Sequence, residues 1–254
     1  MTAELINQFE EAKRVWALSA FVNASKVLIH AKSIGELIDG VCNGVANQQP
    51  YVLACVGLNR EVPDKTIDII GWAGSAKGYV DGLSLSWDES DPLGQGPTGI
   101  AVRSKKPVIL PDTETASNFG SWVLRARAKG IRSSISVPLI ESDIPIGIFI
   151  VYASQPNAFG PAETKLFEML ADELSFGITN LNKNKKLQEE TIRKNRLQEE
   201  LLKTFELTIS AIATTLEFRD PYTAGHQKRV SDIAVAIAKE LNLSTEKVES
   251  IKLA

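Results

Sequence analysis

Apolar residues recur at helical spacing over the longest regular stretch of the chain, which runs from about Pro161 to Arg219. Pro161 suits the first position of a helix, because its missing N–H would have no partner there. Asp220 is followed by Pro221, and a residue before proline is disfavoured in the α region, so the helix is predicted to end there. A helix of this length exceeds one small core and is interpreted as a connector between two modules. Its first apolar positions are Leu166, Phe167, Leu170, Leu174, Ile178 and Leu181.

A heptad count along this stretch, with Phe167 at position a, finds apolar a and d positions at both ends and polar ones in the middle. A continuous tight coiled coil is therefore not predicted. An offset seam through Leu187, Ile192, Leu197 and Leu201 indicates a break in register near 185–195. This pattern has two interpretations. One is a single helix exposed to solvent, and the other is a parallel homodimer through about 163–216, which the apolar seams at both ends favour.

The residues before this stretch predict two helices and then strands. Residues 3–19 and 26–43 have helical periodicity, and Ser25 is the expected cap of the second helix. Short strands are predicted at 51–56 and 66–72. The Gly-, Ser- and Pro-rich residues 74–97 are expected to be irregular.

The pattern then alternates between short helices and strands. Helices are predicted at 98–104 and 121–129, the second ended by Gly130. Strands are predicted at 107–110, 132–140 and 146–152, with the turn of a hairpin at Glu141-Ser142-Asp143. This order indicates an α+β domain, in which helices flank one antiparallel sheet.

Composition narrows the function classes. The chain has 254 residues, of which 44% are hydrophobic, and a net charge of -3. These values predict one or two domains and do not favour a nucleic-acid partner. No run of about 18 apolar residues is present, and the first 14 residues are too charged for a signal peptide, so no membrane segment and a cytoplasmic location are expected. Cys42 and Cys55 have no CxxC spacing and are expected to be buried.

Candidate ligand contacts gather in and around the irregular region. The sequence Gly94-Gln95-Gly96-Pro97-Thr98-Gly99 matches G-x-G-x-x-G, but no buried strand precedes it, so a dinucleotide site is not favoured. Tryptophan side chains can wall a small-molecule pocket, and nearby arginines and serines can orient an anionic or carbonyl-bearing ligand. The alternative is that these are ordinary core, rim or solvated residues. The candidates are Trp72, Trp87, Trp122, Arg125, Arg132, Ser133 and Ser134.

Residues 22–181 resemble a GAF domain, a sensory module that precedes bacterial output domains. The resemblance is carried by 94–101, 107–112, Trp122, 130–139, and 146–152 with the 157–163 segment that opens the long helix. It implies a sheet with a pocket for a small molecule on one face. The signature of cyclic-nucleotide-binding members is not intact, and no Cys-His pair for covalent bilin attachment follows the irregular region. The ligand is therefore left unidentified.

Residues 216–230, which include Asp220-Pro221-Tyr222 and Ala224-Gly225-His226, resemble the opening of an HD-GYP phosphodiesterase domain. In that family the histidine after Ala-Gly is a metal ligand, and it corresponds to His226. The complete family domain implies iron or manganese and hydrolysis of cyclic di-GMP. One histidine cannot build a metal site, so no cofactor and no activity are expected of this chain.

Together these resemblances divide the chain into an N-terminal helix (1–21), a GAF-like domain (22–181), a signalling helix (182–216) and a truncated HD-GYP start (217–254). The expected function is small-molecule sensing that controls a cyclic di-GMP phosphodiesterase. The alternative is a dimerisation scaffold whose GAF pocket is empty.

Overall fold

The fold is taken from a computed structural model of the chain, which describes residues 3–28, 30–47, 49–60, 64–115, 122–219 and 225–253. The chain divides into two compact units, Met1–Asn184 and Lys185–Ala254.

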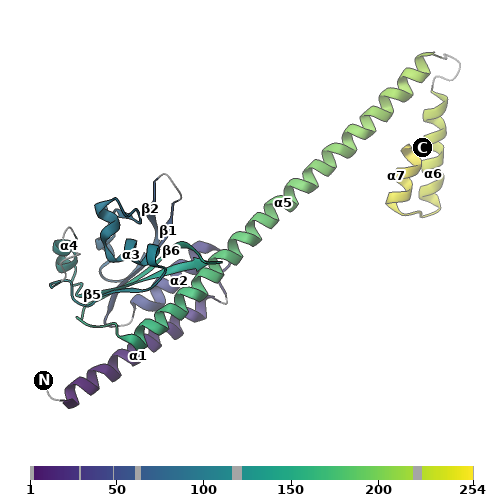
Figure 1. The fold of residues 1–254 in the computed structure, drawn as a ribbon. Coiled ribbons are helices and arrows are strands. Elements are labelled where there is room, and N and C mark those ends of the chain that lie inside the picture. The colour runs from purple at the N-terminus through teal and green to yellow at the C-terminus, as the bar shows by residue number, and fades with distance from the viewer. Residues whose placement is uncertain are drawn as a thin grey trace. The chain divides into compact units, whose positions relative to one another are not determined.

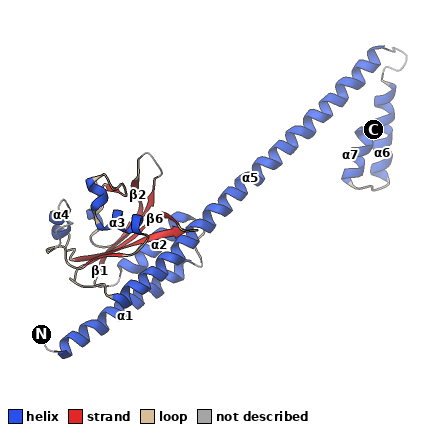
Figure 2. Ribbon diagram, in the orientation of Figure 1, coloured by secondary structure: helices blue, strands red, loops and turns tan. Residues whose placement is uncertain are grey.

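The first unit contains a six-stranded antiparallel sheet with strand order β3-β2-β1-β6-β5-β4, which confirms the predicted α+β class. Figure 2 shows the sheet in red. A bulge between Val56 and Gly57 interrupts the pairing of β1 with β2. The strands are β1 (Tyr51–Asn59), β2 (Thr66–Ala73), β3 (Leu85–Ser86), β4 (Val108–Leu110), β5 (Ser133–Glu141) and β6 (Ile144–Ala153).

Helices cover both faces of this sheet (Figure 1). One face packs against α1 (Ala3–Leu28), α2 (Ile34–Ala46) and the first turns of α5 (Pro161–Arg219). The other packs against α3 (Pro97–Ser104), α4 (Val123–Ala128) and the 3₁₀ turn η1 (Lys77–Tyr79). A second 3₁₀ turn, η2 (Pro92–Gln95), leads into α3. The domain therefore has two hydrophobic cores, one on each side of the sheet.

The central strands β1 and β6 contribute to both cores. On β1, Ala54 and Val56 join the core under α1, α2 and α5, whereas Leu53 and Cys55 join the core under α3 and α4. This alternation follows from the pleat, because successive side chains point to opposite faces. Near-continuous apolar sequence is the pattern of a strand that is covered on both faces.

An aromatic cluster fixes the start of α5 to the sheet. Tyr51 of β1 lies 5.4 Å from Phe167 and 5.8 Å from Phe159, measured between ring centroids. Phe149 of β6 lies 6.4 Å from Phe167. Phe167 is buried in the core together with Leu170 and Leu174.

That burial corrects one expectation about the long helix. The helix itself is confirmed at Pro161–Arg219. Its N-terminal apolar seam, however, faces the sheet and not a partner helix, because a helix adjoining a sheet buries its apolar stripe there first. Among the described residues of α1 and of the part of α5 in this unit, the large apolar side chains that stay exposed are Val15, Leu18, Val22, Met169 and Phe176.

The N-terminal helices also differ from the prediction. α1 continues through Ser25, whose hydroxyl donates to the Glu173 carboxylate at 2.9 Å and so does not cap a helix. α2 starts at Ile34, where Ser33 Oγ accepts from Glu36 N at 3.2 Å. The Glu36 carboxylate in turn accepts from Lys32 N at 2.9 Å. These bonds resemble a capping box and place the helix start eight residues later than predicted.

The other elements lie close to their predicted positions. Lys129 ends α4, and Gly130 follows with φ 70°. Ser142 and Asp143 turn the β5–β6 hairpin with φ 48° and 67°. The two-residue strand β3, inside the region predicted to be irregular, was not predicted.

The second unit contains the remainder of α5, α6 (His226–Glu240) and α7 (Thr245–Leu253). α6 and α7 form a helix pair in which Ser231 Oγ donates to Lys252 O at 3.1 Å and Ala238 is buried. The predicted helix end at Asp220-Pro221 lies outside the described residues. In the described ranges, no helix combines the length and apolarity that crossing a bilayer requires.

Gly44 allows α1 and α2 to approach closely. A Cβ at this position would lie 2.8 Å from Ala24 N and 2.9 Å from Ala24 Cα, which are backbone atoms that cannot rotate away. We expect Gly44→Ala to lower the free energy of unfolding by about 1–3 kcal/mol, because the helices must separate. Urea titration followed by circular dichroism measures this.

Gly35 of the same helix is the matched control. A Cβ there has nothing within 4 Å. Gly35→Ala should leave stability unchanged or raise it by up to about 1 kcal/mol, since alanine is the better helix former. Equal destabilisation by both variants would contradict the close-approach argument.

Candidate functional site

A small cavity lies between the sheet and the segments that cover its α3–α4 face. Its volume is about 20 Å³, which is room for roughly one water molecule. Strands β5 and β6 form its floor, and η1, η2 and the start of α3 form its sides. The lining residues are Tyr79, Leu83, Leu85, Leu93, Gly96, Pro97, Thr98, Trp122, Ser134, Ser136 and Tyr152.

Hydroxyl groups supply most of the polar chemistry of this cavity. Thr98 Oγ1 at the start of α3 lies 3.5 Å from Ser136 Oγ on β5. Ser134 stands two residues earlier on the same face of β5 and pairs in register with Tyr152 of β6. None of the lining side chains is normally charged. The cavity therefore offers neutral donors and acceptors in an apolar frame.

Two tyrosines stand together at the cavity wall. The rings of Tyr79 and Tyr152 are 5.2 Å apart and nearly perpendicular, at 65°. Burial raises the pKa of both phenols above the usual value, and the negative charge that Cys55 would carry if ionised raises both further. Both side chains are therefore neutral hydroxyl groups at physiological pH.

Trp122 covers the cavity from the side of α4. It is partly buried and precedes the first residue of that helix. A Cβ on Gly96 would lie 3.0 Å from its ring, so glycine at this position lets the indole lie against the turn before α3. The indole is the largest side chain of the wall.

The sequence of this region matches a known domain family. The model of the GAF domain family matches residues 31–179 of the chain. The chain belongs to the GAF domain family. No curated protein matches its sequence.

Solved structures show the same fold at low sequence identity. A free methionine-R-sulfoxide reductase from Neisseria meningitidis, solved with its substrate, has 14% identity and a TM-score of 0.55, over 68% of this chain and 93% of that one. The GAF domain of a Coxiella burnetii phosphoenolpyruvate-protein phosphotransferase has 15% identity and a TM-score of 0.53, over 68% and 98%. Its Acinetobacter counterpart has 16% identity and a TM-score of 0.52, over 67% and 97%. These likenesses establish the fold alone.

Arg125 of the GAF domain holds the covering segments together. Its guanidinium donates to Tyr79 O at 2.7 Å, to Gly82 O at 3.4 Å and to Asp81 O. It also lies 5.7 Å from the centroid of the Tyr79 ring. These contacts join α4 to the loop after η1. Arg125 does not line the cavity.

Arg132 and Ser133 are likewise engaged outside the cavity. The Arg132 guanidinium lies 3.0 Å from Asp112 and 3.4 Å from Glu114. Hydrogen bonds from Arg132 hold the pKa of the Asp112 carboxyl below its usual value. Ser133 Oγ donates to Gln155 O at 2.6 Å. These bonds fix the start of β5.

The remaining tryptophans lie elsewhere in the GAF domain. Trp87 donates from Nε1 to Arg60 O at 3.2 Å, and Lys65 lies 5.7 Å from its ring centroid. Trp72 is 43% exposed and lines a different pocket. Of the seven candidate residues, the structure brings Trp122 and Ser134 together in the cavity and places the other five outside its lining.

The cavity residues that the sequence analysis missed are chiefly Tyr79, Thr98, Ser136 and Tyr152. Period-2 alternation could have found two of them. Ser136 shares a strand face with Ser134, and Tyr152 is the partner of Ser134 across the hairpin. Nothing in the local pattern indicates that Tyr79 folds back over the sheet.

The two cysteines are buried apolar residues, as expected. Cys55 lies in the core beneath the covering helices, and burial raises the pKa of its thiol to about 12. Burial also raises the pKa of Cys42, whose Sγ lies 3.9 Å from Gly71 O. Both thiols are neutral and inaccessible, which disfavours thiolate chemistry.

The glycines of the G-x-G-x-x-G stretch have a packing role. A Cβ on Gly94 would collide with Asp88 O, and one on Gly99 would collide with the carbonyl oxygens of Gly94 and Ser86. Close backbone approach accounts for glycine at both positions.

His226, the expected metal ligand, is an exposed residue at the start of α6. Within the described ranges, no group of three or more His, Cys, Asp or Glu side chains could hold a metal ion. The described residues therefore do not fit a complete metal site.

Proposed function

We propose that this chain is a cytoplasmic sensory region whose GAF domain binds a small molecule non-covalently in the cavity under Trp122. The observation that carries the proposal is the lining itself. Five hydroxyl-bearing residues and an indole line an apolar frame beneath loops and short helices. Few convergent polar groups in an apolar setting are the usual composition of a ligand site.

The lining supports a ligand class different from the one first expected. Arg125 and Arg132 had suggested an anionic or carbonyl-bearing ligand, but both make contacts outside the cavity. With hydroxyls and an indole as the polar groups, an uncharged compound that both donates and accepts hydrogen bonds is favoured. Because the cavity holds about 20 Å³, the proposal requires Trp122 and α4 to move when a ligand binds.

Direct contacts link the cavity floor to α5. The β5–β6 hairpin carries Ser134, Ser136 and Tyr152. Near its turn, Ile140 N donates to Ser175 Oγ of α5 at 3.1 Å, and Glu141 pairs with Lys183 at 3.0 Å. A ligand that shifts the hairpin therefore acts on the helix, provided that it binds two helix states with different affinity.

We further propose a parallel homodimer formed through the helices. Within the first unit, Val15, Leu18 and Val22 follow one another at helical spacing on α1 and are exposed. Met169 and Phe176 of α5, seven residues apart, are also exposed. Apolar stripes of this kind on a helix surface mark interaction sites. In the second unit the exposed apolar residues of α5 include Leu187, Ile192, Leu197, Leu201 and Phe205.

A specific observation favours a second candidate function, a dimerisation scaffold without a ligand. The cavity has the volume of roughly one water molecule, so tight packing of the covering segments alone could account for it.

For the C-terminal segment, the proposal rests on the sequence of residues 216–230, which resembles the start of an HD-GYP domain. We propose that the GAF domain controls a cyclic di-GMP phosphodiesterase of this type. In a complete domain, His226 would be one ligand of an iron or manganese site. The described residues contain no group of three or more His, Cys, Asp or Glu side chains that could hold a metal ion, and no catalytic step is assigned to them.

Thermal-shift screening with small uncharged compounds tests the ligand proposal. At a ligand concentration of about 100 Kd, binding adds about 2.7 kcal/mol to stability, which raises the Tm by several degrees. We expect Trp122→Ala to abolish most of this shift, and Trp72→Ala, outside the cavity, to retain it. If no compound shifts the wild type and a crystal structure shows a fully packed cavity, the ligand proposal is wrong.

Light scattering after size exclusion tests the dimer. Phe176 is 69% exposed, and Phe176→Asp places a charge on the proposed interface. We expect the dimer Kd to rise by about 100-fold or more. Ile144→Asp is the control, because Ile144 is 64% exposed but lies at the start of β6. A monomeric wild type, or a dimer that resists Phe176→Asp, would rule out this interface.

The chain should not hydrolyse cyclic di-GMP, even with added manganese or iron, because His226 has too few neighbouring ligands. Product formation measured by chromatography checks this. Turnover that disappears in His226→Ala and persists in His30→Ala would show that the metal site is complete and contradict the prediction.

A further inference from the structure

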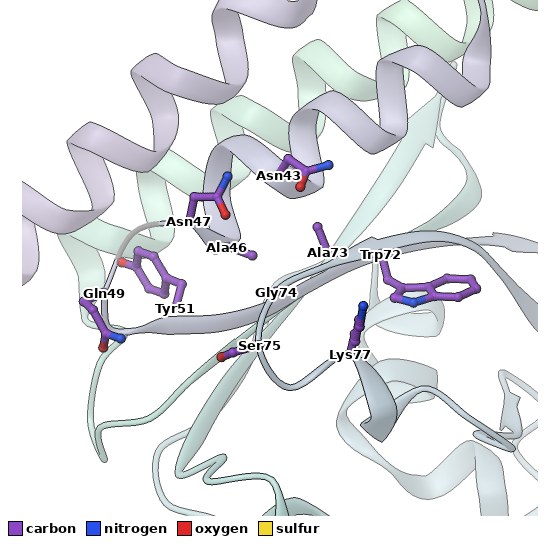
Figure 3. Close-up of a pocket in the computed structure, with 10 residues that line it drawn as sticks. All are labelled: Asn43, Ala46, Asn47, Gln49, Tyr51, Trp72, Ala73, Gly74, Ser75 and Lys77. Carbon is purple, nitrogen blue, oxygen red and sulfur yellow. The ribbon is translucent and has the colours of Figure 1, made fainter.

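A pocket of about 530 Å³ beside Trp72 is formed by the end of α2, the start of β1 and the turn after β2. Its side chains lie on different sides of the sheet. Trp72 pairs with Cys55, whose side chain belongs to the core under α3 and α4, whereas Asn43 and Asn47 belong to α2 on the opposite face. In Figure 3, Gln49 points away from the tryptophan and from both asparagines. These groups do not converge, and no ligand is assigned to this pocket.

A groove between α1, α2 and α5 has lining residues that contact one another. Its volume is about 370 Å³, well above the roughly 150 Å³ in which a benzene ring can bind. Leu28 of α1, Leu37 of α2 and Leu181 of α5 give it apolar surface. A Cβ on Gly177 would lie 2.9 Å from Leu37 Cδ2, so glycine lets the leucine lie directly against α5. The groove is therefore wide enough for an aromatic side chain.

The α5 residues of this groove have the spacing of a hole in a coiled coil. Glu173, Phe176, Gly177 and Asn180 stand at i, i+3, i+4 and i+7 and so share one stripe of the helix. In a parallel coiled coil, a side chain at position d enters a hole formed by four residues of the facing helix, at a, d, e and the next a. With Phe176 at d, that hole consists of these four residues, and the side chain that fills it is Phe176 of a second copy.

The surrounding residues support a second copy of this chain as the occupant. Phe176 is 69% exposed and adjoins the groove, and a projecting ring beside a recess on the same surface is self-complementary about a two-fold axis. Met169, one heptad earlier, is also exposed. Asn180 takes position a, where a single asparagine specifies the register of a two-stranded coiled coil. Ser25 Oγ donates to the Glu173 carboxylate at 2.9 Å, which holds this charge toward α1.

This stripe is distinct from the apolar seam of α5 that packs on the sheet. Phe167, Leu170 and Leu174 are buried in the domain core, whereas the stripe through 169, 173, 176 and 180 faces outward. The exposed Val22 of α1 precedes Ser25 of the groove by three residues, so the exposed apolar surface of α1 continues into the same groove.

We propose that two copies of this chain pair in parallel and in register through the start of α5, and that Phe176 of each copy inserts into the groove beside Gly177 of the other. This inference rests on the homodimer proposed above and specifies its contact in the GAF domain.

A double-mutant cycle tests the insertion, with the dimer Kd of the full chain measured by analytical ultracentrifugation. Phe176→Ala removes the ring without adding a charge, and we expect the Kd to rise about 30-fold or more. Gly177→Ala adds a methyl group to the groove, and the flexible end of Leu37 can turn aside for it. We expect this change to raise the Kd about tenfold in the wild type and to have no further effect in Phe176→Ala.

Gly35→Ala is the matched control, because a Cβ there has nothing within 4 Å, and it should leave the dimer Kd unchanged. Thermal unfolding at a concentration where every variant is monomeric should match the wild type, which separates loss of the contact from loss of the fold.

Disulfide formation tests the register. In-register pairing brings position 180 of one copy next to position 180 of the other, so Asn180→Cys should cross-link under mild oxidation and run as a dimer on a non-reducing gel. Ile144→Cys is the control, since Ile144 is exposed at the start of β6. The wild type should not cross-link, because Cys42 and Cys55 are buried.

The outcomes separate this inference from the dimer on which it rests. A wild type that stays monomeric overturns both. A wild-type dimer that Phe176→Ala does not weaken, or that Gly177→Ala weakens equally with and without the ring, overturns the insertion alone. A dimer in which Asn180→Cys cross-links no faster than Ile144→Cys overturns the in-register pairing of α5.

Discussion

The first unit depends on one constraint: strands β1 and β6 are apolar on both faces and must be covered twice. Residues such as Val56 and Phe149 point to one side, and Cys55 and Ile150 to the other. Long helices cover the first side of the sheet, where Gly44 lets α1 and α2 approach each other closely. Short helices and turns cover the second side. Irregular backbone covers a sheet face less evenly than a helix does, and the cavity arises on that side.

The same constraint determines what α5 can do. Its first turns are part of the core, so the helix cannot rotate about its axis there without exposing Phe167 or Leu174. Motion of the start of α5 must instead accompany a change in the sheet or hairpin. The hydrogen bond from Ile140 N to Ser175 Oγ and the ion pair of Lys183 with Glu141 lie at the C-terminal end of this anchored segment. A movement of the strands that carry Ser134 and Ser136 would therefore be transmitted to α5 through these two contacts.

Local patterns predicted most elements of the fold but few of the cavity residues. Strands and the long helix depend on periodicity, which neighbouring residues display directly. The start of α2 was misplaced because the prediction used Ser25 as the cap, whereas Ser33 with Glu36 three residues later has the spacing of a capping box. Ser25 instead contacts Glu173, which lies 148 residues away in sequence. Arg125 and Arg132 have the composition of ligand contacts, yet their partners are backbone carbonyls and carboxylates that only the folded chain brings near.

Comparison of the two pockets shows why their chemistry differs. The cavity under Trp122 is enclosed, so a charge there would lose its hydration without compensation, and its lining contains only neutral side chains. The pocket beside Trp72 is open to water, where the ammonium of Lys77 keeps its hydration. A neutral ligand would gain from enclosure and would be coupled to movement of the covering segments. The open pocket needs no such movement, because it is already formed in the present structure.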